Sequence, residues 1–396
     1  MRVLIINHFP IAGSGSGTYT RNIAIHLIQK GHDVAIVMPE NTMQYTGVPG
    51  VIMYPAFFTY DEPIKGALPF NFPCFTTHPR SATSFFDLDD EQLNAYLSAF
   101  ERVIEKAVAE FKPDVIHAQH IWLLTWLAKK TGVPYVVTAH GTDLMGYQKS
   151  SRFREYAHEA ASGAKRIITI SNDNDDLVAE LFPDCAGKTA FMRNGYDPTQ
   201  FFPEEQLTQE EVLSWFDIKP LKRLVLFTGK LTYFKGVDVL LDATRLYEGE
   251  RPGEIVTIVA GDGELSLQLK KQVEDNMLKN VNFLGFLDIS QLRGLYNAAD
   301  VCIVPSRREP FGLVAVEALA CGSPVVATNQ GGLPDIINDK VGSLVDVDDA
   351  FGLSVAIQQE LYRSDRVERG QYAAKYALDK YAQEHMIDLL VEIFES

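Results

Sequence analysis

Residues 305–322 read PSRREPFGLVAVEALACG, and this stretch decides the fold and the site that the sequence predicts. The apolar run just before it, at 301–304, is typical of a buried parallel strand, and a helix is predicted to begin near Gly312. That helix is apolar on every side except at Glu317, and a helix that is apolar all round is usually buried. Because an unpaired carboxylate is costly in such a place, Glu317 needs a partner that donates hydrogen bonds.

The beginning of this helix favours an anion. The backbone N–H groups of Gly312, Leu313 and Val314 have no partner inside the helix, and this arrangement suits a phosphate. Glu309 lies in the loop just before them, and a pair of sugar hydroxyls would satisfy Glu317. Two carboxylates that flank a phosphate-binding helix start indicate a nucleotide-sugar site. The alternative is a buried helix whose glutamate caps a neighbouring backbone.

Bulk properties limit the class of protein. A chain of 396 residues exceeds what one hydrophobic core usually supports, so we expect two domains. The net charge of −16 argues against binding to nucleic acid or acidic membranes. The apolar run at the start of the sequence is too short for a signal-peptide core, and no apolar run is long enough to span a bilayer. The four cysteines lack metal-binding spacing. We therefore expect a cytoplasmic protein with no transmembrane segment; the sequence leaves its oligomeric state open.

Strands and helices alternate along the chain, which predicts an α/β fold with parallel sheets. Strands are predicted in the first half at 3–7, 34–38, 115–118, 135–138, 166–170 and 189–192. A second series follows a hinge at 194–198, with strands at 224–227, 255–260, 281–284, 301–304 and 324–327. After Ser364 the chain is predicted to be helical to its end.

The segment 55–86 does not fit this alternation. It is rich in Phe, Pro and Thr and has neither helical nor strand periodicity. A long irregular segment inside a compact domain is usually functional or disordered, and this one is too aromatic for plain disorder. We interpret it as a surface that faces the acceptor or forms an interface, or as an ordinary packed excursion.

A glycine-rich loop, GSGSG at 13–17, follows the first strand and precedes a helix. Glycines allow close approach of a ligand, and a helix start favours phosphate, so Gly15 and Gly17 are candidate ligand contacts. Taken as a dinucleotide fingerprint the loop is weak, because Thr18 stands where the last glycine belongs. A Rossmann oxidoreductase that uses Gly13, Gly15 and Glu40 is nevertheless one alternative.

Two further motifs stand at predicted strand ends, where function concentrates in parallel sheets. His140 lies in AHGTD at 139–143, and Asp143 could orient a loop or contact an acceptor. The stretch FTGKLTYFKG at 227–236 supplies two cations, Lys230 and Lys235. Charged hydrogen bonds contribute roughly 1.5–3 kcal/mol each, so two lysines and helix N-termini can hold a diphosphate on an acidic protein.

Taken together, these motifs resemble the retaining glycosyltransferases of family 4, which have the GT-B fold. Glu309 and Glu317 resemble the E-x7-E signature of that family, and 229–236 resembles its G-R-x-x-x-x-K-G stretch, with Lys230 in the place of the more frequent Arg. The stretches 260–264, 284–287 and 329–334 resemble further motifs of the family in the same order.

The resemblance implies two Rossmann-like parallel-sheet domains that face a central cleft. The implied divisions are 1–198 for an acceptor-side domain, 199–378 for a nucleotide-sugar-binding domain, and 379–396 for a helix that returns to the first domain. Two residues are expected to act in catalysis, His140 facing the transferred sugar and Glu309 bonding its hydroxyls. The expected donor contacts are Gly15, Gly17, Gly229, Lys230, Lys235, Phe286, Leu287, Phe311, Gly312, Leu313, Val314 and Glu317.

Within that set the resemblance assigns the diphosphate to the two lysines, the ribose diol to Glu317, and the nucleobase to the backbone of 286–287. The implied activity is retaining transfer of a hexosyl unit, of the glucose or N-acetylglucosamine type, from a nucleoside diphosphate sugar. We expect a UDP-linked donor, with GDP-mannose open, a small-molecule, lipid or glycan acceptor, and no cofactor or essential metal. The alternatives are a sugar-nucleotide epimerase of the same fold, an inactive binding module, and the NAD-dependent oxidoreductase.

Overall fold

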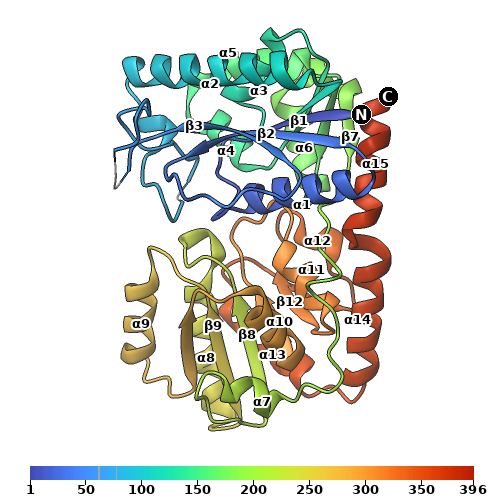
Figure 1. Cartoon of the computed structure of the whole chain (residues 1–396). Helices are drawn as coiled ribbons and strands as arrows, with labels where there is room; N and C mark the ends of the chain where they lie inside the picture. Colours follow the sequence, from blue (N-terminus) through green and yellow to red (C-terminus); the bar gives the residue numbers. More distant parts are fainter. Residues whose placement is uncertain (61–62, 77) are drawn as a thin grey trace. The chain divides into compact units, whose positions relative to one another are not determined.

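The computed structural model describes residues 1–60, 63–76 and 78–396. They form two compact units (Figure 1), each an α/β unit around a parallel sheet, as the sequence predicts. Unit 1 comprises Met1–Arg193 and Met386–Ser396, and unit 2 comprises Asn194–His385. The chain therefore passes between the units after Arg193 and after His385, whereas the sequence motifs set these divisions at residues 198 and 378.

The sheet of unit 1 has seven strands in the order β3-β2-β1-β4-β5-β6-β7, and every pairing is parallel. The strands are β1 (Arg2–Ile6), β2 (Asp33–Glu40), β3 (Ile52–Phe57), β4 (Val115–Gln119), β5 (Tyr135–Thr138), β6 (Arg166–Thr169) and β7 (Thr189–Phe191). The main helices are α1 (Gly15–Gln29), α2 (Asp90–Phe111), α3 (Leu123–Lys130), α4 (Thr142–Lys149), α5 (Arg154–Gly163), α6 (Asn172–Leu181) and most of α15 (Gln383–Glu395).

Alternating residues of the central strand β1 fill two cores, one on each face of this sheet. Leu4 and Ile6 join the core under α2, α3 and α5, while Val3 and Ile5 join the core under α1 and α15. Figure 1 shows these helices on opposite faces of the sheet. Because both faces are covered, β1 is apolar from Val3 to Ile6 and shows none of the alternation of a half-exposed strand.

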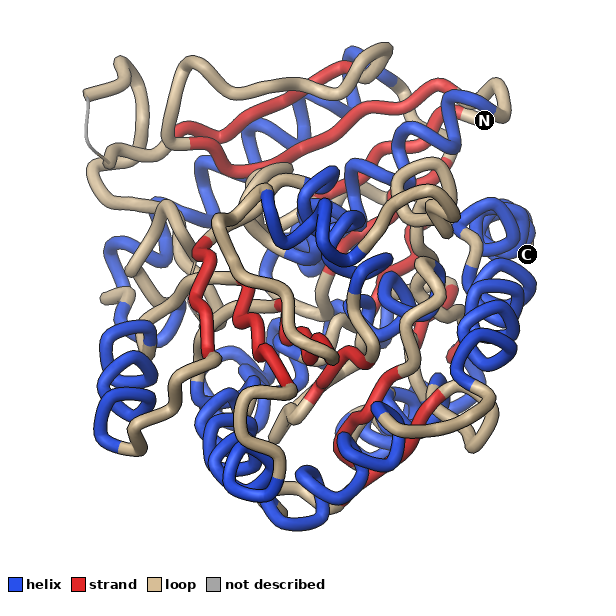
Figure 2. The backbone as a smooth tube through the Cα atoms, turned by 90° about the horizontal axis from the view of Figure 1, so that it is seen from below, coloured by secondary structure: helices blue, strands red, loops and turns tan. Residues whose placement is uncertain are grey.

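The sheet of unit 2 has six parallel strands in the order β10-β9-β8-β11-β12-β13. The strands are β8 (Arg223–Thr228), β9 (Ile255–Ala260), β10 (Val281–Gly285), β11 (Val301–Val304), β12 (Val325–Thr328) and β13 (Gly342–Val345). The helices are α7 (Gln209–Ser214), α8 (Val237–Glu250), α9 (Ser266–Asp275), α10 (Ile289–Ala298), α11 (Leu313–Ala320), α12 (Leu333–Ile336), α13 (Ala350–Leu361) and α14 (Arg366–Tyr381). Figure 2 colours strands and helices separately and shows the strands of this sheet enclosed by helices.

Two strands escape prediction from the sequence, and both lie at the edge of a sheet. β3 (Ile52–Phe57) pairs with β2 alone and contains Pro55, which an edge strand tolerates because it need not donate every hydrogen bond. β13 (Gly342–Val345) is four residues long and begins with a glycine. The segment 55–86 therefore starts inside a strand, which corrects its interpretation as irregular from residue 55 onward.

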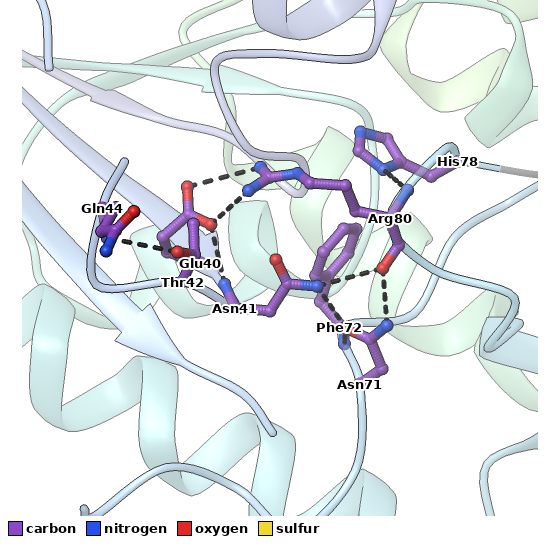
Figure 3. Close-up of polar contacts among 8 residues, drawn as sticks. All are labelled: Glu40, Asn41, Thr42, Gln44, Asn71, Phe72, His78 and Arg80. Carbon is purple, nitrogen blue, oxygen red and sulfur yellow. Dashed lines mark hydrogen bonds and ion pairs between the residues drawn. The ribbon is translucent and has the colours of Figure 1, made fainter. Parts of the chain in front are cut away.

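A polar network fastens the rest of that segment to the end of β2 (Figure 3). Arg80 donates from Nη1 to Oε1 of Glu40 over 2.6 Å. Asn41 donates to the Asn71 side chain and to the Arg80 carbonyl, both over 3.0 Å, and Asn71 donates to the same carbonyl over 2.6 Å. Residues 61, 62 and 77 of the segment lie outside the described residues.

The aromatic side chains of this segment fill the core of unit 1. Phe58, Phe72 and Phe85 are fully buried, and Phe75 is nearly so. This burial explains the aromatic composition and favours the packed excursion over a surface that faces the acceptor or forms an interface. Because the carboxylate of Glu40 is held by Arg80, it is not presented to a ribose as the oxidoreductase alternative requires.

We expect Arg80→Ala to destabilise unit 1. Glu40 is 2% exposed, so removal of its cationic partner leaves a buried carboxylate unpaired. Because Arg80 is itself partly exposed, the cost should be roughly 2–3 kcal/mol in the free energy of unfolding. Urea unfolding followed by tryptophan fluorescence measures this change, since two of the three tryptophans, Trp122 and Trp126, lie in unit 1.

The matched control is Lys106→Ala, which removes an exposed pair between Lys106 and Glu110 at 4.0 Å. Such pairs contribute about 0–1 kcal/mol, so the control should unfold close to the wild-type midpoint. An equal, small effect of both substitutions would contradict a structural role for the Glu40–Arg80 pair.

Candidate functional site

The loops that follow β8, β11 and β12 bring the predicted donor residues of unit 2 to one edge of its sheet. These three strands are neighbours and run parallel, so their carboxyl ends coincide. Lys230 follows β8, Ser306 and Glu309 follow β11, and Gln330 follows β12. The separate motifs of the sequence therefore meet in space.

Glu309 is held in place by four contacts. Its carboxylate Oε2 lies 2.6 Å from Nζ of Lys235 and accepts a hydrogen bond of 3.3 Å from Ser306. Its backbone N–H donates to the side chain of Gln330 over 3.1 Å, and its carbonyl accepts from Gly332 over 2.9 Å. Sequence reasoning found Lys235 and Glu309 but missed Ser306 and Gln330, although the Ser306 hydroxyl lies only three residues before Glu309.

Two glycines allow these loops to approach one another. Gly236 has φ of 64°, and a Cβ at that position would lie 2.0 Å from the carbonyl oxygen of Pro305. Gly331 has φ of 58°, and its Cβ would lie 2.0 Å from the carbonyl oxygen of Glu309. Any other residue would push the loops apart. The family-like K-G and G-G pairs therefore have a steric reason here.

The helix α11 begins where the sequence predicts. Gly312 is its N-cap with φ of 107°, a left-handed conformation that favours glycine. Among the described residues, none accepts a hydrogen bond from the N–H groups of Gly312, Leu313 or Val314. These three donors remain for an anion. Phe311 is buried with its ring 6.2 Å from that of Tyr381, so its side chain belongs to the core.

Glu317 lies one helical turn beyond this anion site and is partly accessible. Its Oε2 accepts a hydrogen bond of 3.3 Å from the hydroxyl of Tyr296, which in turn lies 2.6 Å from Oγ1 of Thr228. Burial raises the pKa of Glu317 to about 8, and the Tyr296 hydrogen bond partly offsets that rise. Tyr296 of α10 therefore supplies one of the hydrogen-bond donors that the sequence predicts for Glu317, and no motif indicates this tyrosine.

Arg307 is another residue that the sequence motifs do not indicate, although it lies within residues 305–322. Its guanidinium donates twice to Asp238, over 2.9 and 2.7 Å, and once to Asp348 over 2.6 Å. It also donates to the carbonyl of Tyr233 over 2.9 Å, and its backbone N–H donates to that of Phe234 over 2.8 Å. Arg307 therefore ties the loop of Glu309 to the turn that carries Lys235.

The other donor-site candidates of unit 2 fall on the same edge. Gly229 and Lys230 follow β8 directly, and the N–H of Gly229 donates to Ala260 over 3.0 Å. Phe286 lies in the loop after β10 and is 89% exposed, while the side chain of Leu287 is buried. A contact of either residue with a nucleobase stays a prediction.

In unit 1, His140 lies directly after β5 at the carboxyl edge of the sheet. Its backbone N–H donates to Oδ1 of Asp143 over 3.1 Å, and Oδ2 of the same carboxylate accepts from the N–H of Ile121 over 2.7 Å. Asp143 thus orients two loops, which is one of the two roles that the sequence suggests for it. Burial raises the pKa of Asp143 to about 6, partly offset by these backbone donors.

The glycines at 15 and 17 in unit 1 have different surroundings. α1 begins at Gly15, so most of the glycine-rich stretch lies in the first helical turn and not in a loop before it. Ser14 caps the helix by accepting from the N–H of Gly17 over 3.0 Å, and a Cβ at Gly17 would lie 2.3 Å from the carbonyl of Pro10. Gly17 therefore has a packing role, whereas Gly15 faces open space. Ligand contacts of both residues stay predictions.

Two Rossmann-like parallel-sheet units with these loops define the class of fold called GT-B. A model described as Glycosyltransferase Family 4 matches residues 13–200, and one described as Glycosyl transferases group 1 matches residues 213–377. The D-inositol 3-phosphate glycosyltransferase of Saccharomonospora viridis is 30% identical over 344 residues, which are 79% of this chain and 78% of that protein. The chain belongs to the GT-B glycosyltransferases of the family 4 type, and the predicted family and fold are confirmed.

Two other similar proteins extend this finding. The glycogen synthase of Mycobacterium tuberculosis is 28% identical over 398 residues, 96% of this chain and 90% of that one. A crystal structure of Anabaena HepE in complex with UDP and glucose has a TM-score of 0.76 and 18% identity, with both chains covered in full. At that identity the structural likeness shows the fold.

In residues 1–60, 63–76 and 78–396, no helix has the length and hydrophobicity to span a bilayer. Across the same residues, no group of three or more His, Cys, Asp or Glu side chains is arranged to hold a metal ion.

We expect the free energy of unfolding of unit 2 to depend on pH through the titration of Glu317. Its pKa of about 8 in the fold lies above the ordinary value of 4.5, so the folded state favours the protonated carboxyl. This stabilisation is complete below about pH 4.5 and is lost as the pH rises through about 8. Glu317→Gln is neutral at every pH, so its stability relative to the wild type should rise between pH 5 and 8 and then level off.

Urea unfolding midpoints at pH 5, 6.5, 8 and 9 measure this difference. The exposed Glu274→Gln on α9 of the same unit serves as the control, since its side chain stands in water. A constant difference between Glu317→Gln and the wild type across this range would show that the carboxyl titrates normally.

Proposed function

We propose that this glycosyltransferase moves a hexosyl unit from a nucleoside diphosphate sugar to an acceptor with retention of configuration. The donor is UDP-linked glucose or N-acetylglucosamine. One observation carries the proposal: the Lys235–Glu309 pair, at 2.6 Å, stands in the loops that lead into the three unpaired N–H groups of α11. A cation, a hydroxyl acceptor and an anion site thus share one edge of the sheet.

The names of the similar proteins support a donor of this kind. The relatives are a glycogen synthase and a D-inositol 3-phosphate glycosyltransferase, and the HepE crystals contain UDP and glucose. The acceptors implied by these names differ from one another. The proposal therefore names the donor class and leaves the acceptor as a small molecule, lipid or glycan.

Each part of the donor would meet a group of matching chemistry. Lys230 and Lys235 would hold the diphosphate together with the N–H groups at the start of α11, because its charge must be neutralised on a protein with net charge −16. The carboxyl group of Glu317, which burial favours in its neutral form, would accept from the ribose hydroxyls. Glu309, fixed by Lys235 and Ser306, would accept from hydroxyls of the sugar.

The proposed step exchanges one bond for another on the same face of the sugar. The bond between the anomeric carbon and the diphosphate oxygen breaks, and the acceptor oxygen bonds to the carbon from that side. The leaving diphosphate takes the proton of the acceptor hydroxyl. His140 would supply an imidazole to the sugar as positive charge develops on it, and the step uses no metal ion.

We expect Lys235→Ala and Glu317→Ala to bind UDP-glucose much more weakly than the wild type does. Loss of a charged hydrogen bond of roughly 1.5–3 kcal/mol corresponds to a ten- to hundredfold rise in Kd. A thermal-shift panel with UDP-glucose, UDP-N-acetylglucosamine, ADP-glucose and GDP-mannose measures binding, since a ligand of the native state raises Tm. Release of UDP measures turnover.

Lys222→Ala is the matched control, because Lys222 is an exposed lysine in unit 2 that pairs with Glu254 at 2.7 Å. It should keep the wild-type shift with every nucleotide sugar. Wild-type binding and turnover in both site variants would refute the proposed role of Lys235 and Glu317 in donor binding. Isomerisation of the donor without an acceptor would mark an epimerase, and binding without any turnover would mark a binding module.

A further inference from the structure

Gln119 and His140 form a buried pair at the carboxyl edge of the unit 1 sheet. Gln119 is the last residue of β4 and is fully buried, and its Oε1 lies 2.8 Å from Nε2 of His140. β4 and β5 are neighbouring parallel strands, with Gln119 in register with Thr138, two residues before His140.

The chemistry of the two partners sets the position of one proton. An amide oxygen accepts hydrogen bonds and cannot donate them, so the contact requires a proton on Nε2 of His140. In a neutral imidazole the lone pair then lies on Nδ1. Among the described residues, none is hydrogen-bonded to that nitrogen.

The groups around His140 favour the neutral ring. The centroid of the His140 ring lies 5.1 Å from that of Tyr19 in α1. It lies 4.7 Å from that of His120, which follows β4. The nearby carboxylate of Asp143 accepts from two backbone N–H groups, so it bonds the backbone of His140 and not its ring. Burial lowers the pKa of His140 to about 3.

The neighbouring histidines add no positive charge. Burial lowers the pKa of His117 to about 3, with repulsion from His140 as a smaller cause, and holds that of His120 well below its usual range. His117 lies within β4, and its Nε2 is 2.8 Å from Oγ1 of Thr138. The cluster is therefore composed of neutral imidazoles at neutral pH.

The amide nitrogen of Gln119 provides a second, independent observation. This Nε2 is buried and has no hydrogen-bond partner among the described residues. Buried polar groups are nearly always paired in folded proteins, and each exception asks for a role or a missing partner. A ligand oxygen at this edge of the sheet would supply one.

We propose that Gln119 is a positioning residue that holds His140 in the neutral tautomer protonated at Nε2, so that Nδ1 accepts a hydrogen bond from a ligand hydroxyl. The inference deepens the proposed function, on which it rests for the identity of that hydroxyl as one of the transferred sugar. The geometry of the pair stands on its own. Sequence reasoning selected His140 and gave no sign of the residue that orients it.

The first test reads the tautomer without any turnover. In protein labelled with ¹⁵N-histidine, long-range ¹H–¹⁵N spectra distinguish protonated from unprotonated ring nitrogens, and His140→Gln identifies the signals of His140 by their loss. The expected result from pH 5 to 9 is a protonated Nε2 and an unprotonated Nδ1. A proton on Nδ1, or a charged ring near neutral pH, would overturn the proposal.

The second test replaces the amide. Gln119→Glu places a carboxylate against Nε2, which raises the pKa of His140. Its kcat should then fall as the pH drops below that raised pKa, about tenfold per pH unit, while the wild type shows no such ionisation. Gln119→Leu should lower kcat at every pH without a new ionisation, because the ring loses its orientation.

Thr125→Val is the matched control, since it removes another buried polar contact of this region, the hydrogen bond from Thr125 to the carbonyl of His120. It should keep the wild-type pH profile. Wild-type kcat and pH profile in both Gln119 variants would overturn the positioning role. Failure of the wild type to use any nucleotide sugar would refute the proposed function, while the spectra would still decide the tautomer.

Discussion

All strands of both sheets run parallel, and this constraint brings the candidate site residues of each unit to the carboxyl edge of its sheet. Each sheet delivers the carboxyl ends of its strands to one edge, so residues far apart in the chain become neighbours there. In unit 2 the edge gathers Lys235, Glu309 and the N–H groups that begin α11. In unit 1 it gathers Gln119, His140 and, through α4, Asp143.

The ionisable groups at these edges are each held in a defined charge state, which matters on a protein of net charge −16. Lys235 neutralises Glu309 over 2.6 Å. Burial favours the neutral forms of Glu317 and His140, by raising the pKa of the first and lowering that of the second. In each unit, an edge arranged in this way carries few net negative charges, although the protein as a whole is acidic.

The central parts of the fold could be predicted from the sequence because they are buried on both faces. β1, β8, β9 and β11 appear in the sequence as largely apolar runs. The edge strands β3 and β13 were missed, because β3 contains Pro55 and β13 is only four residues long and begins with a glycine. The start of α1 was obscured by glycines that favour a loop but pack closely in its first turn.

The sequence alone was enough to predict the family and the parallel α/β fold, both of which are confirmed, and to select Glu309, Gly312 and Glu317 as candidates from a local pattern. Tertiary structure alone decided what holds them. Tyr296 reaches Glu317 from another helix, and Gln119 reaches His140 from the neighbouring strand. A motif records the spacing of residues along one loop or helix, which the chain geometry fixes locally. A hydrogen bond between segments depends on strand order and register, and these exist only once the sheet has formed.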